Sequence, residues 1–113
     1  MTSALSGLAS RMLPPLVTPG GERRLSILIY HRVLPQRDLM RPSEPTVDEF
    51  RWQMKLLRRH FNPLPLPEAV QRLQNGDLPP RAVCVTFDDG YADNASLALP
   101  VLRESGVPAS VFV

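Results

Sequence analysis

Residues 82–90 are Ala-Val-Cys-Val-Thr-Phe-Asp-Asp-Gly, and this stretch decides the fold. The first six residues form an apolar and β-branched run, which is typical of a strand covered on both faces in a parallel sheet. Cys84 is the only cysteine of the sequence, so no internal disulfide can form, and we expect a buried, unreactive thiol. Two carboxylates and a glycine follow at the point where the strand would end.

Two more strands of the same kind are expected, one before and one after this stretch in the sequence. Residues 25–30 are Leu-Ser-Ile-Leu-Ile-Tyr, and residues 109–113 are Ala-Ser-Val-Phe-Val. Residues 64–66 predict a further short extended piece. Because helical segments separate these strands, the pattern predicts an α/β fold with parallel strands and right-handed crossovers.

The first helix begins with a clear signal. Thr46 and Glu49 have the spacing of a capping box. Apolar residues then recur every three or four positions at 47, 50, 54, 57 and 61, which predicts one buried stripe. Basic residues gather towards the C-terminal end, where the helix dipole favours cations.

Two further helices are predicted from their ends. Pro67 can occupy the first turn of the second helix, and Asn75-Gly76 predicts its end. The third helix is expected from Asp93 or Asn94 to Ser105-Gly106. Pro100 lies inside this segment and should kink the helix or split it in two.

The boundaries of the chain lead to two expectations. Residues 1–24 contain several prolines and glycines and are expected to form a loose leader, with one domain portion over residues 25–113. The last apolar strand has no following segment to cover or pair it, which predicts a fragment, truncated after its third main strand.

Composition excludes several classes of protein. The net charge is +2 and no Lys/Arg block exceeds two residues, so nucleic-acid binding is not indicated. No apolar run approaches the roughly 20 residues of a membrane span. No basic residue precedes Arg11, which itself interrupts the apolar letters, so the leader lacks a convincing signal peptide. The compartment and the oligomeric state stay open.

Polar side chains of catalytic type follow two of the predicted strands. His31 follows the first strand, and Asp88 and Asp89 follow the strand at residues 82–87. In parallel α/β folds, reactive groups collect at the C-terminal ends of strands. Adjacent carboxylates repel unless a cation or hydrogen bonds offset their charge, so a divalent metal site is one interpretation. A solvated Asp-Asp-Gly turn and a structural histidine are the alternatives.

The hexapeptide at residues 86–91, Thr-Phe-Asp-Asp-Gly-Tyr, resembles the first signature of the polysaccharide deacetylase family, the carbohydrate esterases with a NodB-type domain. The similarity extends to residues 27–33, which resemble the opening strand of that family, and to residues 50–61, which resemble the helix that follows. Residues 97–113 resemble the segment after the signature. About 89 residues are thereby covered in the right order.

The resemblance implies a distorted (β/α) barrel that removes N-acetyl groups from amino-sugar polysaccharides. By position, Asp88 would be the general base and Asp89 a ligand of zinc or a similar divalent ion. His31 and Tyr91 would lie close to the polysaccharide substrate.

One departure from the family pattern has consequences for activity. The family completes its metal site with a downstream His-(Ser/Thr)-x-x-His pair, whereas His31 and His60 are the only histidines here and form no such pair. Since a catalytic zinc takes about three protein ligands, the site is expected to be incomplete and this chain inactive on its own.

Two other functions compete with that of a deacetylase. A non-catalytic carbohydrate-binding or scaffold remnant of the same fold stays open. A signalling receiver domain places its acidic pair at the first strand and needs a later lysine, whereas no lysine follows Lys55 here, so this second interpretation is not favoured.

Overall fold

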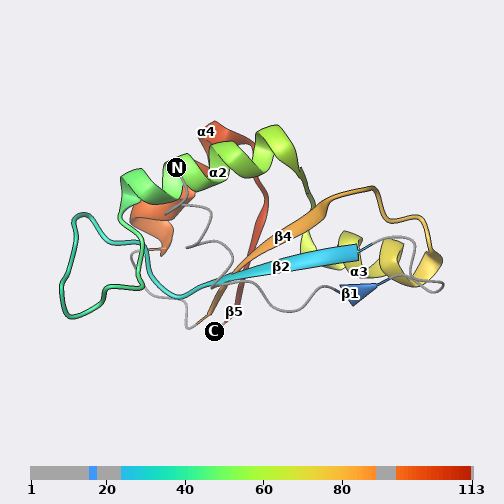
Figure 1. Cartoon of the computed structure of the whole chain (residues 1–113), viewed down its shortest axis with the longest axis horizontal. Helices are drawn as coiled ribbons and strands as arrows, with labels where there is room; N and C mark the ends of the chain where they lie inside the picture. Colours follow the sequence, from blue (N-terminus) through green and yellow to red (C-terminus); the bar gives the residue numbers. More distant parts are fainter. Residues whose placement is uncertain (1–15, 18–23, 89–93, 113) are drawn as a thin grey trace.

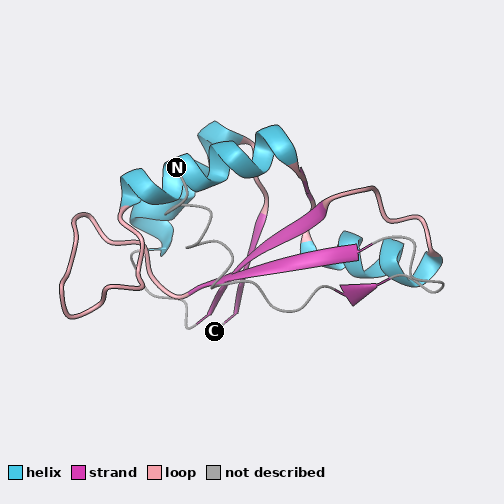
Figure 2. Ribbon diagram, in the orientation of Figure 1, coloured by secondary structure: helices cyan, strands magenta, loops and turns pink. Residues whose placement is uncertain are grey.

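A computed structural model describes residues 16–17, 24–88 and 94–112 of the chain. Strands and short helices alternate along the sequence, as Figures 1 and 2 show. The elements are β1 (Leu16–Val17), β2 (Arg24–Tyr30), α2 (Val47–His60), β3 (Asn62–Pro63), α3 (Leu66–Asn75), β4 (Ala82–Asp88), a π-helical turn η1 (Asn94–Ala98), α4 (Leu99–Ser105) and β5 (Ala109–Phe112).

Strand β4 is the centre of the sheet. It pairs in parallel with β2 over its first six residues, from Leu25 opposite Ala82 to Tyr30 opposite Phe87. Along its other edge it pairs in parallel with β3 at its start and with β5 over its second half. The expected parallel α/β arrangement is therefore confirmed.

Two layers of helices cover the sheet. Helices α2 and α4 lie together on one face and α3 lies on the other (Figure 1). Side chains alternate between the two faces along each strand. On β4, Val83, Val85 and Phe87 pack towards α2 and α4, whereas Ala82 and Cys84 belong to the smaller cluster beneath α3.

Helix α2 follows the sequence signals closely. Thr46 is its N-cap, its side chain accepts a hydrogen bond from the Glu49 amide at 3.2 Å, and the Glu49 carboxylate accepts one from the Thr46 amide at 2.9 Å. Phe50, Met54 and Leu57 of the predicted stripe are buried. The capping box and the stripe are both confirmed.

The other helices end where glycine permits. Gly76 and Gly106 adopt left-handed conformations, with φ of +75° and +67°, and their amides bond back to the last turns of α3 and α4. The third predicted helix is split, as expected from Pro100: η1 precedes α4, and Pro100 lies in the first turn of α4.

Two extended pieces differ from the sequence prediction. The short strand was predicted at residues 64–66, but β3 begins two residues earlier, at Asn62. Pairing with the sheet begins there because the Asn62 amide donates a hydrogen bond to the Arg81 carbonyl, just before β4. Leu64 then bonds to the Val83 carbonyl just outside the strand. Within the stretch expected to be a loose leader, β1 pairs antiparallel with the start of β2.

Candidate functional site

The register of β2 and β4 brings two of the predicted site residues together. Tyr30 lies opposite Phe87, so the next residues of the two parallel chains, His31 just after β2 and Asp88 at the end of β4, lie side by side. The distance between His31 Nε2 and Asp88 Oδ2 is 3.8 Å. This distance is within the range of an ion pair and beyond that of a hydrogen bond.

Both side chains of this pair are open to solvent. Their exposed fractions are 46% for His31 and 43% for Asp88. An exposed pair of this kind contributes little to stability, about 0–1 kcal/mol, so stability alone does not explain its placement. The arrangement leaves a carboxylate and an imidazole accessible to a ligand at the C-terminal edge of the sheet.

A buried aromatic cluster fixes the ends of these two strands. The rings of Tyr30, Phe50 and Phe87 pack with centroid distances of 5.1 to 5.7 Å. The Tyr30 hydroxyl donates a hydrogen bond of 2.6 Å to the buried Gln53 of α2. Because such a cluster resists displacement, it holds the residues that precede His31 and Asp88 in fixed positions.

The bond between Tyr30 and Gln53 was not predicted from the sequence. The available signal was the position of Gln53, three residues after Phe50, at the edge of the apolar stripe of α2. A polar residue at such a position requires a buried partner.

On the other face of the sheet, the Thr86 hydroxyl donates a hydrogen bond of 3.0 Å to the Leu28 carbonyl. This bond ties β4 to β2 two residues before Asp88.

The segment after His31 is a long loop, as predicted, and its two ends are joined. The Leu34 amide donates to the Pro45 carbonyl at 2.9 Å, and the Val47 amide donates to the Leu34 carbonyl at 2.8 Å. The Arg32 amide donates to the Glu44 carboxylate at 3.2 Å. The backbone beside His31 is therefore anchored to the start of α2.

The remaining predicted site residues, Asp89 and Tyr91, lie outside the described residues, as does Gly90. Within the described ranges, no group of three or more His, Cys, Asp or Glu side chains could hold a metal ion. His31 and Asp88 supply two donors, fewer than the three protein ligands of a typical catalytic zinc. These two residues alone do not fit a zinc site.

Cys84, His60 and Trp52 lie outside this candidate site. Cys84 is fully buried, and burial raises the pKa of its thiol to about 11, so an unreactive thiol is the outcome, as expected. His60 is exposed at the end of α2, and Trp52 is half-buried on the same helix.

Comparison with known proteins agrees with this arrangement. A family model described as polysaccharide deacetylase matches residues 75–113. The putative polysaccharide deacetylase YxkH of Bacillus subtilis (strain 168) is 35% identical over 92 residues. This match covers 80% of the chain but only 32% of the relative, so the chain spans about a third of the length of that deacetylase.

Solved structures confirm the fold class. IcaB from Ammonifex degensii is 33% identical with a TM-score of 0.64, and the match covers 79% of this chain and 37% of that one. The Streptococcus pyogenes deacetylase PplD, in complex with acetate, has a TM-score of 0.65 at 24% identity, over 87% of this chain and 42% of that one. The described residues therefore correspond to part of a deacetylase-type α/β domain.

Proposed function

We propose that this chain forms part of an enzyme that hydrolyses the N-acetyl groups of an amino-sugar polysaccharide, with Asp88 as the general base. The family match supports a deacetylase. The observation that supports the assignment of Asp88 is its position, at the end of the central strand, half exposed and beside His31. A general base needs this combination of a fixed backbone and access to the substrate.

The reaction in this proposal is the hydrolysis of an amide. The Asp88 carboxylate takes a proton from a water molecule as that water adds to the acetamide carbonyl. The carbon–nitrogen bond then breaks, the amine of the sugar leaves with a proton, and acetate is released. Positioned proton transfer of this kind contributes typically 10²–10⁴-fold to a rate.

A divalent metal belongs to the same proposal. Asp89 is the proposed ligand of zinc or a similar ion, together with ligands that this sequence does not contain. The resemblance to the family signature at residues 86–91 supports this assignment. Since the family's downstream histidine pair is absent from this sequence, and Asp89 alone or with His31 supplies fewer than three ligands, we propose that the 113-residue chain is inactive by itself.

His31 and Tyr91 are proposed to act on the substrate and not in the chemical step. The His31 imidazole, 3.8 Å from Asp88, can orient that carboxylate or contact the polysaccharide. Its replacement in His31→Ala is expected to raise KM, with a smaller effect on kcat than Asp88→Asn. Tyr91→Ala is likewise expected to raise KM. A loss confined to kcat in both variants would contradict these roles.

The test measures acetate release from oligomers of N-acetylglucosamine by the natural protein that contains this chain. Asp88→Asn removes the basic carboxylate with almost no change in shape and should lower kcat by about 10²–10⁴-fold. Asp77→Asn changes an exposed carboxylate outside the site and is the matched control, expected to retain wild-type activity. Equal activity of the two variants would refute the role of Asp88.

The alternative is a carbohydrate-binding or scaffold protein without catalysis. It predicts that the natural protein binds the oligomers and releases no acetate, and that Asp88→Asn leaves binding unchanged. The 113-residue chain itself is expected to release no acetate even with added zinc. Measurable release by that chain would refute the proposal that it is inactive.

A further inference from the structure

Two buried polar side chains lie behind the candidate site, one on each face of the sheet. Gln53 of α2 accepts a hydrogen bond of 2.6 Å from the Tyr30 hydroxyl, and the Thr86 hydroxyl of β4 donates one of 3.0 Å to the Leu28 carbonyl. Tyr30 apart, Gln53 and Thr86 are the buried polar residues of the described ranges. Their position beside the two strand ends needs an explanation.

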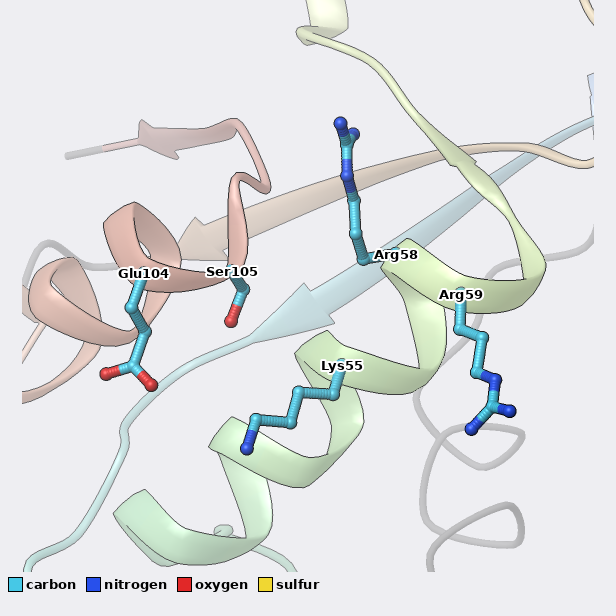
Figure 3. A pocket seen from close by; sticks show the side chains of 5 residues that line it. All are labelled: Lys55, Arg58, Arg59, Glu104 and Ser105. Atoms are coloured by element: carbon cyan, nitrogen blue, oxygen red, sulfur yellow. The ribbon is translucent and has the colours of Figure 1, made fainter.

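The basic side chains of α2 show how differently Gln53 is placed. Lys55, Arg58 and Arg59 are exposed and extend from the helix in different directions, where they line an open pocket of about 290 Å³ beside α4 (Figure 3). These cations do not converge on one ligand. Gln53, by contrast, lies in the interior beside the sheet, where a polar side chain is costly unless it is paired.

Stability alone does not explain the two buried hydrogen bonds. A buried hydrogen bond replaces bonds to water, so its net contribution is small, and an apolar pair of the same shape can be as stable. A hydrogen bond differs from an apolar contact because it fixes both a distance and a direction. The Tyr30 hydroxyl is thereby held at one point of α2, and Thr86 at one point of β2.

Each bond fixes the chain beside a different member of the candidate site. Tyr30 is the residue before His31, so its attachment to α2 fixes the point where the chain leaves β2. Thr86 lies two residues before Asp88 on the same face of β4, so its attachment to β2 fixes the end of β4. The separation of 3.8 Å between His31 and Asp88 depends on both attachments.

We propose that Gln53 and Thr86 are positioning residues of the candidate site. Gln53 acts through Tyr30 on His31, and Thr86 acts on Asp88. This inference rests on the proposed function, in which Asp88 is the general base and His31 acts on the substrate. A displaced base lowers kcat, since a misplacement of about 1 Å can cost about 100-fold in rate, whereas a displaced His31 raises KM.

The first test separates kcat from KM in acetate release from oligomers of N-acetylglucosamine by the natural protein. Thr86→Val keeps the shape of the side chain and removes its hydroxyl, so kcat should fall about tenfold with KM little changed. Thr86→Ser keeps the hydroxyl and should keep kcat close to that of the wild type. Tyr30→Phe combined with Gln53→Met removes the other bond without leaving a buried group unpaired, and should raise KM about threefold or more with kcat little changed.

Cys84→Ala is the matched control for a purely structural effect. It trims a buried side chain on the same face of β4 and touches neither hydrogen bond. It should lower the midpoint of urea unfolding and leave kcat and KM unchanged. If Thr86→Val behaved in the same way, less stable but with unchanged kinetics, the role of Thr86 in positioning would be overturned.

A second readout does not require activity. The Cε1–H signal of the His31 ring, followed by NMR in the natural protein, should shift when Asp88→Asn removes the carboxylate 3.8 Å away. In the background of Thr86→Val, or of the double variant at residues 30 and 53, this shift should be about half as large or less, because the interaction weakens as the two side chains separate.

The NMR shift also distinguishes this inference from the proposed function. A shift of full size in the Thr86→Val background would overturn the role of Thr86, and one in the double variant would overturn that of Gln53. If the natural protein releases no acetate, the proposed function fails, and the shift of the His31 signal still decides whether the two buried hydrogen bonds hold the pair in place.

Discussion

The two faces of the sheet differ in what they bury. The face beneath α2 and α4 has a core of large side chains, among them Tyr30, Phe50 and Phe87. The face beneath α3 has a much smaller cluster of buried residues, in which Ala82 and Cys84 are the contributions of β4. One face of the central strand therefore holds most of the apolar mass of the fold.

The face with the smaller core is also the face of the candidate site. Side chains alternate along β4, so Asp88 points away from Phe87, towards the side of Cys84 and Thr86. His31 accompanies Asp88 at 3.8 Å. One strand thus meets two demands, because its odd positions pack in the larger core, while its even positions pass from the smaller cluster at Ala82 and Cys84 to the polar Thr86 and Asp88.

The largest effect is expected from breaking the core on the α2 side. Phe50 is fully buried and packs edge-on against Tyr30, with a centroid distance of 5.1 Å. Phe50→Ala removes the ring and leaves a cavity, so it should lower the free energy of unfolding by about 3–5 kcal/mol. Urea unfolding of the natural protein measures this loss. A cost below about 1 kcal/mol would show that the cluster does not hold α2 on the sheet.

A smaller effect is expected on the α3 side. Cys84→Ser replaces a fully buried thiol by a hydroxyl in an apolar cluster, at a cost of about 1–3 kcal/mol. If Cys84→Ser were to cost as much as Phe50→Ala, the two faces would not differ as described. The same urea unfolding experiment, run on both variants, decides this point.

The buried thiol should also make the free energy of unfolding depend on pH in the alkaline range. Burial raises the pKa of Cys84 from 9.0 to about 11 in the folded protein. Between these two values the folded state keeps the thiol proton while the unfolded state releases it. The free energy of unfolding is therefore unaffected by this group below pH 9 and falls as the pH rises from 9 to about 11. Cys84→Ser should remove this decline. An unchanged decline in the variant would assign it to other groups.

The start of α2 tests the contribution of a local signal. Thr46→Ala removes the side chain that accepts from the Glu49 amide and should cost about 1 kcal/mol. Ser43→Ala, at an exposed position of the preceding loop, is the control and should cost almost nothing. Equal stabilities of the two variants in urea would contradict the capping role.

The stabilisation by this cap should depend on pH in the acid range, because Glu49 is part of it. Burial raises the pKa of Glu49, but hydrogen bonds from the Thr46 amide and from Arg37, with the charge of Arg37, outweigh burial and lower it below 4.5. The carboxylate therefore stabilises the fold above that value, and this contribution is lost as the pH falls through the lowered pKa. Glu49→Gln should flatten that part of the acid unfolding curve.

The capping box also shows which features of the fold are predictable from sequence. The signals of Thr46, Glu49, Gly76 and Pro100 are local, since each depends on the backbone of its own segment. The strand ends at His31 and Asp88 were predictable for a related reason, because a buried apolar run stops where polar residues begin. The parallel order of strands then brings these ends to one edge.

Features that depend on tertiary contacts were not predictable in the same way. The position of β3 depends on a bond between Asn62 and the Arg81 carbonyl, 19 residues apart in the sequence. The pairing of Tyr30 with Gln53 requires the angle at which α2 crosses β2. The contact of α2 with α4 joins Arg51 to Glu104, 53 residues apart in the sequence. No local pattern encodes these distances.

The smallest effects are expected from the ion pairs on the helices of the two faces. Glu68 and Arg72 form a half-exposed pair one turn apart on α3, at 3.7 Å, whereas Arg51 of α2 contacts Glu104 of α4 at 3.2 Å and also Asp48. Glu68→Gln should cost about 0.3–0.5 kcal/mol and Glu104→Gln no more than about 1 kcal/mol, and both losses should shrink in high salt. Unfolding in urea at low and high salt measures them. Similar losses in the two variants would show that the two faces differ in stability through their apolar cores and not through their surface charges. A loss above about 2 kcal/mol in Glu104→Gln would instead show that the ion pair with Arg51 contributes much of the stability of the contact between α2 and α4.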